Sequence, residues 1–174
     1  MDVTEFREPP GNHGNRNGVV VTPREYLDQV MRPNLADLDA EPGNIRFALN
    51  AVHSVDALAA RIYVAAGGRD ALGDKDDTAY RERLASTHDD FRLMRDLAKA
   101  IKHVELGRGS PLVQTASQVR SMSIGLGQAV WGELEFDAPP KAVVALESGV
   151  HRVIAAVVRN AVSFLETTMQ HHGL

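Results

Sequence analysis

Residues 44–68, which read NIRFALNAVHSVDALAARIYVAAGG, predict the central helix of the fold. Apolar side chains recur there at spacings of three and four residues, which places them along one face of a helix. The opposite face is thinly polar, with single polar residues separated by alanines, so we expect this helix to lie centrally in a bundle. Gly67 and Gly68 are suited to end it, because glycine readily adopts the left-handed conformation that closes a helix.

A helix is also expected before this stretch, over residues 22–38. Thr22 is suited to be its N-cap, Pro23 fits the first helical position, and Glu25 completes a capping box with Thr22. Pro33 lies inside the segment and cannot donate the hydrogen bond that a regular helix requires there. We therefore expect this helix to be bent or interrupted at Pro33.

The rest of the chain predicts two more helices with strands between them. One long helix is expected over residues 76–106, and Ser148 caps a final helix that extends to about residue 170. Between these helices the apolar period changes, and short segments rich in valine are separated by turn compositions. These expected strands are residues 112–120, 128–136 and 141–147.

The predicted fold class is therefore α+β and mainly α. It is a four-helix up-and-down-type bundle with a three-stranded antiparallel sheet, residues 113–147, inserted before the last helix of a single domain that spans residues 22–174. Residues 1–21 are expected to form a flexible arm. Most of residues 8–18, EPPGNHGNRNG, are Pro, Gly, Asn or charged, and such a segment cannot offset its ordering entropy by burial.

The composition narrows the class of protein. The chain has 174 residues, of which 44% are apolar and 24% charged, as in ordinary soluble globular proteins. It has no cysteine, which excludes thiolate catalysis and cysteine-based zinc sites; we expect no metal and no cofactor. No apolar run approaches the roughly 18 residues of a spanning helix, so we expect a cytoplasmic protein without membrane contact. A net charge of −4 argues against a broad DNA-binding surface.

Polar side chains recur at three-residue steps on two of the predicted helices, 44–66 and 76–106. Residues three, four and seven apart share one side of a helix, so these side chains can form an acid, amide and imidazole network between helices. Such a network suits ligand binding or proton transfer, because histidine titrates near neutral pH; a solvated face with internal ion pairs is the alternative. The ligand-binding candidates are Asn50, His53, Asp56 and Lys99, and the catalytic candidates are Asp96, Lys102 and His103.

The segments that carry these residues, ALNAVHSVDAL and FRLMRDLAKAIKHVEL, resemble an uncharacterised bacterial family. In that family a helix with NxxHxxD-like residues precedes one that reads DxANAxKHxxL, followed by a few strands and a last helix. The resemblance covers residues 44–170, and Lys99 stands where the family has asparagine. It implies a fold and brings no established activity.

A weaker similarity is to HEPN domains, all-α bundles of which many are metal-independent ribonucleases with an Arg and a His on one helix. This similarity implies a ribonuclease or a toxin or defence component, in which His103 is the acid or base and Lys102, Lys99 or Arg95 stabilises the scissile phosphate. Our main functional prediction is instead an interaction or small-ligand-binding module. Its alanine-rich helices permit close packing, and we expect it to form a homo-oligomer with a small ligand or RNA as a possible partner.

Overall fold

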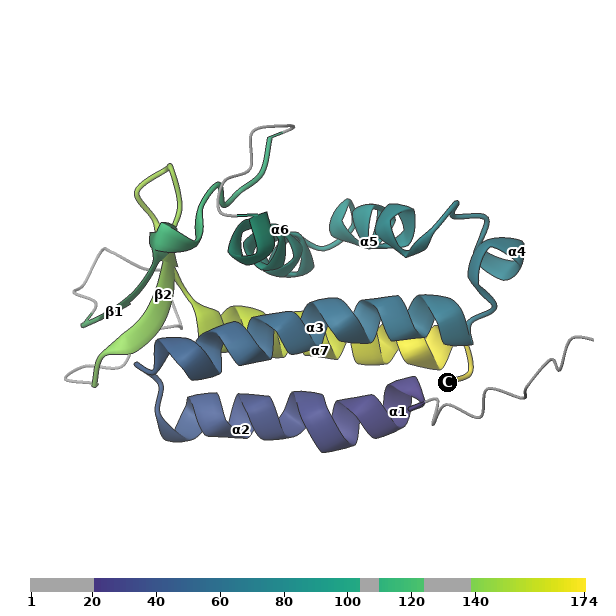
Figure 1. Ribbon diagram of the computed structural model, residues 1–174, viewed down its shortest axis with the longest axis horizontal. Coiled ribbons are helices and arrows are strands. Elements are labelled where there is room, and N and C mark those ends of the chain that lie inside the picture. Colours follow the sequence, from purple (N-terminus) through teal and green to yellow (C-terminus); the bar gives the residue numbers. More distant parts are fainter. Residues whose placement is uncertain (1–20, 104–109, 124–138) are drawn as a thin grey trace, which may run out of the picture.

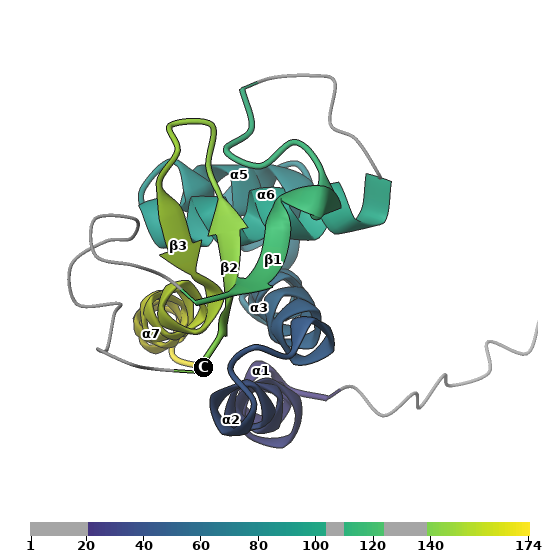
Figure 2. The ribbon, with the colours of Figure 1, turned by 90° about the vertical axis from the view of Figure 1, so that its left-hand side faces the viewer.

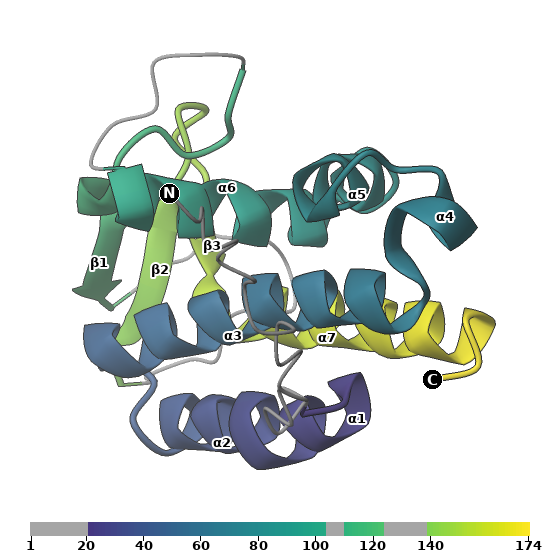
Figure 3. The same ribbon diagram turned by 45° about the vertical axis from the view of Figure 1, so that its right-hand side comes forward.

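The described part of the chain forms three helical layers with a small sheet at one end (Figure 1). The computed structural model describes residues 21–103, 110–123 and 139–174. Most of the expected arm and the expected strand at 128–136 lie outside these residues. Helices α1 and α2 form one layer, α3 and α7 the middle layer, and α5 and α6 the third (Figure 3).

The first layer is a helical run with an irregular turn in its middle. The helix α1 (Pro23–Tyr26) begins with the predicted capping box between Thr22 and Glu25. A π-helical turn, η1 (Leu27–Met31), separates it from α2 (Arg32–Ala40), which has Pro33 in its first turn. Proline has no N–H to donate to the preceding turn. The expected interruption is confirmed, and it falls immediately before Pro33.

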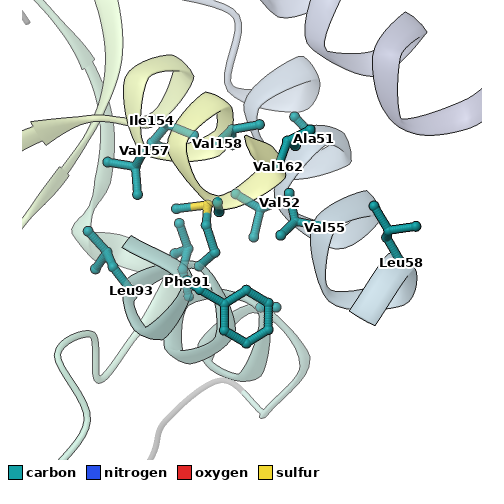
Figure 4. Close-up of a cluster of buried hydrophobic side chains, with 14 of the residues drawn as sticks. Ala51, Val52, Val55, Leu58, Phe91, Leu93, Ile154, Val157, Val158 and Val162 are labelled. Carbon is teal, nitrogen blue, oxygen red and sulfur yellow. The ribbon is translucent and has the colours of Figure 1, made fainter. Parts of the chain in front are cut away.

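The predicted central helix is confirmed as α3 (Ile45–Ala65). Asn44 caps it by accepting a hydrogen bond from the N–H of Arg46 at 3.1 Å. Gly67 follows its end with a φ of 94°, the left-handed conformation that the sequence predicts there. Apolar side chains of α3 face those of α6 and α7 in one buried cluster (Figure 4), which includes Ala51, Val52, Val55, Leu58, Phe91, Leu93, Ile154, Val157, Val158 and Val162.

The prediction of one long helix over residues 76–106 was wrong, because two helices occupy its place. They are α5 (Asp77–Ala85), capped by Asp76, and α6 (Asp89–His103). Between them Thr87 donates its hydroxyl to the Leu84 carbonyl at 2.8 Å, and His88 Nδ1 accepts from the Phe91 N–H at 3.1 Å. These side chains form hydrogen bonds with backbone groups that would pair with other backbone groups in a continuous helix. In the part of the chain that the structure describes, the bundle therefore has one more helix than the four expected, and the short α4 (Gly68–Leu72) lies before α5.

A three-stranded antiparallel sheet precedes the final helix, as expected. The predicted strand 141–147 is confirmed, the predicted strand 112–120 is a strand only in its last two residues, and one strand lies outside the predicted segments. The order of the sheet is β1 (Val119–Met122), β2 (Lys141–Ala145) and β3 (His151–Val153). The third strand was expected to belong to the final helix, which begins only at α7 (Ile154–His171). Ser148 does not cap that helix; it lies in the turn between β2 and β3, where Gly149 has a φ of 81°. Figure 2 shows the sheet across the ends of the helices.

The turn between α2 and α3 is held against the sheet at Gly43. The carbonyl of Pro42 accepts a hydrogen bond from the Ala142 N–H of β2 at 2.6 Å. A Cβ at Gly43 would lie 2.8 Å from the Pro140 carbonyl oxygen and 2.9 Å from Ser121 Oγ. Position 43 therefore has no room for a side chain while the sheet stays in place.

We predict that Gly43→Ala lowers the free energy of unfolding by about 1–3 kcal/mol, because the new methyl overpacks this contact. Adding Ser121→Ala should recover part of the loss, since it removes the hydroxyl that the methyl meets at 2.9 Å. Urea denaturation of wild type, both single variants and the double variant provides the measurement. Wild-type stability of Gly43→Ala would contradict the prediction.

Candidate functional site

Asp56 is a buried carboxylate at which three helices meet. It lies on α3 with a relative exposure of 5%. Its Oδ2 accepts hydrogen bonds from Arg81 Nη1 of α5 at 2.7 Å and from Lys102 Nζ of α6 at 3.0 Å. A buried carboxylate is costly unless it is paired, so these two cations are what permits Asp56 to lie there. We call His53, Asp56, Arg81 and Lys102 the polar seam.

Arg81 is the residue of the polar seam that sequence reasoning missed. Its side chain is 18% exposed. It is held in place by Asp77, whose carbonyl accepts from Nε at 3.2 Å and whose Oδ2 accepts from Nη2 at 2.7 Å. The four-residue spacing of Asp77 and Arg81 was a usable signal, because that spacing favours an ion pair within one helix. Nothing local, however, indicates that Arg81 also reaches Asp56.

The other oxygen of the Asp56 carboxylate is unsatisfied. Asp56 Oδ1 is buried and has no hydrogen-bond partner among the residues that the structure describes. A buried acceptor of this kind normally binds a donor from the protein, from water or from a ligand. Lys102 has donors to spare, since its side chain is 50% exposed and its ammonium makes one described hydrogen bond. The polar seam thus offers an acceptor and a cation side by side.

His53 lies one turn before Asp56 on α3 and is half-buried. Burial lowers the pKa of its imidazole, the positive charge of Lys102 lowers it further, and the negative charge of Asp56 opposes both. The net effect is a pKa below the ordinary 6.5. The imidazole is therefore neutral at neutral pH, with one nitrogen able to accept a proton or a hydrogen bond.

Asp96 and Lys99 belong to a second network on α6. Asp96 is 2% exposed; its Oδ1 accepts from Arg95 Nε at 3.0 Å and Nη2 at 2.7 Å, and its Oδ2 accepts from the Leu112 N–H at 2.9 Å. Glu82 of α5 pairs with both Arg95 and Lys99. Burial acts to raise the pKa of Glu82, but the hydrogen bond from Lys99 and the charge of Arg95 outweigh it and lower the pKa. Both Asp96 oxygens are thus engaged: Oδ1 by Arg95 of the same helix, and Oδ2 by the backbone of Leu112, which it holds against α6.

The remaining candidates, Asn50 and His103, are exposed. Neither side chain makes a hydrogen bond or an ion pair with another residue in the described part of the chain. Of the candidates that the sequence singles out, the structure brings His53, Asp56 and Lys102 together, with Arg81 added. It keeps Asp96 and Lys99 in a separate network.

The described residues were also searched for metal sites and membrane spans, and the chain was compared with known proteins. Within residues 21–103, 110–123 and 139–174, no group of three or more His, Asp or Glu side chains is placed to hold a metal ion. No helix in the described part has both the length and the apolarity needed to cross a membrane. Comparison with family models, with curated proteins and with solved structures finds no match.

The lowered pKa of His53 predicts how its contribution to the stability of the folded chain depends on pH. Because the folded chain binds this proton more weakly than an ordinary histidine does, the contribution of His53 to stability is fully present above pH 6.5. It is lost as the pH falls below that value towards the folded pKa. We expect the NMR titration midpoint of the His53 imidazole to lie below 6.5.

Lys102→Met should raise that midpoint, since the ammonium of Lys102 is one of the causes that lower it. Lys75→Met is the matched control, because Lys75 is a well-exposed lysine with no part in the His53 shift. A midpoint at or above 6.5 in the wild type, or a fall in Lys102→Met, would contradict the assigned cause.

Proposed function

We propose that this chain is a small-ligand-binding module and that the polar seam is its binding site. The observation that carries the proposal is the unpartnered, buried Oδ1 of Asp56 beside the half-exposed ammonium of Lys102. A purely structural ion pair between helices would explain Oδ2, with its two cations, and would leave Oδ1 unexplained. Perturbed pKa values gather at functional sites, and His53 adds one to the seam.

The chemistry of the seam indicates which ligands suit it. Lys102 provides a positive charge for a carboxylate or phosphate, and Asp56 Oδ1 provides an acceptor for a hydroxyl or amino group. Neutral His53 provides one donor and one acceptor. A small anion that carries a hydroxyl or amino group, such as a hydroxy acid, an amino acid or a ribonucleoside monophosphate, satisfies all of these positions.

A thermal-shift screen of the full chain against a panel of those compounds tests the proposal. A ligand present at 100 times its Kd stabilises the folded chain by about 2.7 kcal/mol, which gives a clear rise in Tm. Lys102→Met should weaken the binding of a hit by roughly 10- to 100-fold, the effect of one charge-assisted hydrogen bond. Lys99→Met is the matched control: Lys99 lies on the same helix, one turn earlier, and pairs with Glu82 instead of Asp56.

A flat response over the whole panel contradicts the proposal. Equal binding by wild type and Lys102→Met also contradicts it, because the ligand then lies elsewhere.

The ribonuclease alternative stays a prediction, tested by incubating RNA with wild type and His103→Ala in EDTA. Arg95, which that alternative invokes, is already engaged by Asp96 and Glu82. Self-association and a cytoplasmic location also stay predictions, and light scattering tests the first.

A further inference from the structure

A groove lies along the C-terminal half of α3, and unlike the polar seam it is lined mainly by apolar side chains. It lies where the start of α1 runs beside the C-terminal half of α3 (Figure 1) and has a volume of about 420 Å³, within the range of small-molecule sites. Val64 in its lining is 68% exposed. The groove is lined by Val21, Thr22, Pro23, Ala60, Arg61, Val64 and Ala65.

Arg61 is the one charged side chain in this lining. Its guanidinium lies 4.0 Å from the centre of the Tyr26 ring, and Nη1 donates to the Ala57 carbonyl at 3.4 Å. No carboxylate forms an ion pair with it among the residues described. Its stacking on Tyr26 fixes the guanidinium in place while most of its N–H donors stay available.

The polar groups at the other side of the groove are already occupied. The N–H and the hydroxyl of Thr22 both donate to Glu25 Oε2 at 2.9 Å. These bonds lower the pKa of Glu25, so its carboxylate is charged at neutral pH. The Thr22 donors are therefore not available to an anion, and Arg61 is the cationic partner that the lining of the groove offers.

We propose that this groove binds a small molecule with an apolar body and a single carboxylate. The carboxylate pairs with Arg61 in the two-bond geometry that a guanidinium favours. The apolar body covers Ala60, Val64 and Pro23. One unpaired positive charge matches one negative charge, and the apolar lining favours an aliphatic or aromatic body over a polar one. This site shares no residue with the polar seam and stands whether or not the seam binds a ligand.

Titration of the full chain with sodium octanoate, followed by NMR of the valine methyl groups, tests the proposal. Saturable shifts are expected at Val64. Arg61→Gln should weaken octanoate binding by about tenfold or more, the effect of losing a charged hydrogen bond. Arg46→Gln is the matched control and should bind as the wild type does. Arg46 lies on the same helix and also stacks on a ring, with its guanidinium 4.7 Å from the centre of the Phe47 ring.

Octylamine and 1-octanol serve as ligands of equal length without the negative charge, and both should bind at least tenfold more weakly. Val64→Glu is a second variant that should abolish octanoate binding; its side chain is exposed, so the fold tolerates it. The proposal is overturned if octanoate does not saturate, if Arg61→Gln binds it as well as wild type, or if 1-octanol binds equally well.

Discussion

The burial of the Asp56 carboxylate is the constraint on which the placement of α5 and α6 against α3 depends. A carboxylate removed from water on an apolar helix must be matched by positive charge, and Asp56 obtains it from two helices at once. Arg81 of α5 and Lys102 of α6 both donate to its Oδ2, at 2.7 and 3.0 Å. This fixes where α5 and α6 lie along α3, which apolar contacts alone, being non-directional, do not fix.

The same constraint creates the chemistry of the seam. Two cations on one oxygen leave Oδ1 unsatisfied, and Lys102 helps to keep His53 neutral. The network around Asp96 shows the opposite arrangement, in which both carboxylate oxygens are bonded. Polar residues at similar helical spacings therefore differ in their bonding: both Asp96 oxygens are bonded, whereas Oδ1 of Asp56 has no partner among the described residues.

Structural features that depend on neighbouring residues could be predicted from the sequence, whereas features that depend on distant residues could not. The extent and apolar face of α3 and the glycine that follows its end are local features, and all three were predicted. The break at residues 86–88 was missed because Ser, Thr and His side chains that bond to the backbone there are also compatible with a helix interior. Ser148 resembles a helix cap, but pairing with β2 makes residues 151–153 a strand. Asp56 was expected on a polar face of the helix. Its burial could not be predicted from the neighbouring residues, because it depends on pairing with Arg81, 25 positions away.

A double-mutant cycle between Asp56 and Arg81 tests most directly whether their ion pair holds α5 against α3. The free energies of unfolding of wild type, Asp56→Asn, Arg81→Gln and the double variant give the coupling energy between the two side chains. A charged hydrogen bond with this degree of burial predicts a coupling of about 1.5–3 kcal/mol. A coupling below about 0.5 kcal/mol, the limit of additivity for independent sites, would contradict the role assigned to Asp56.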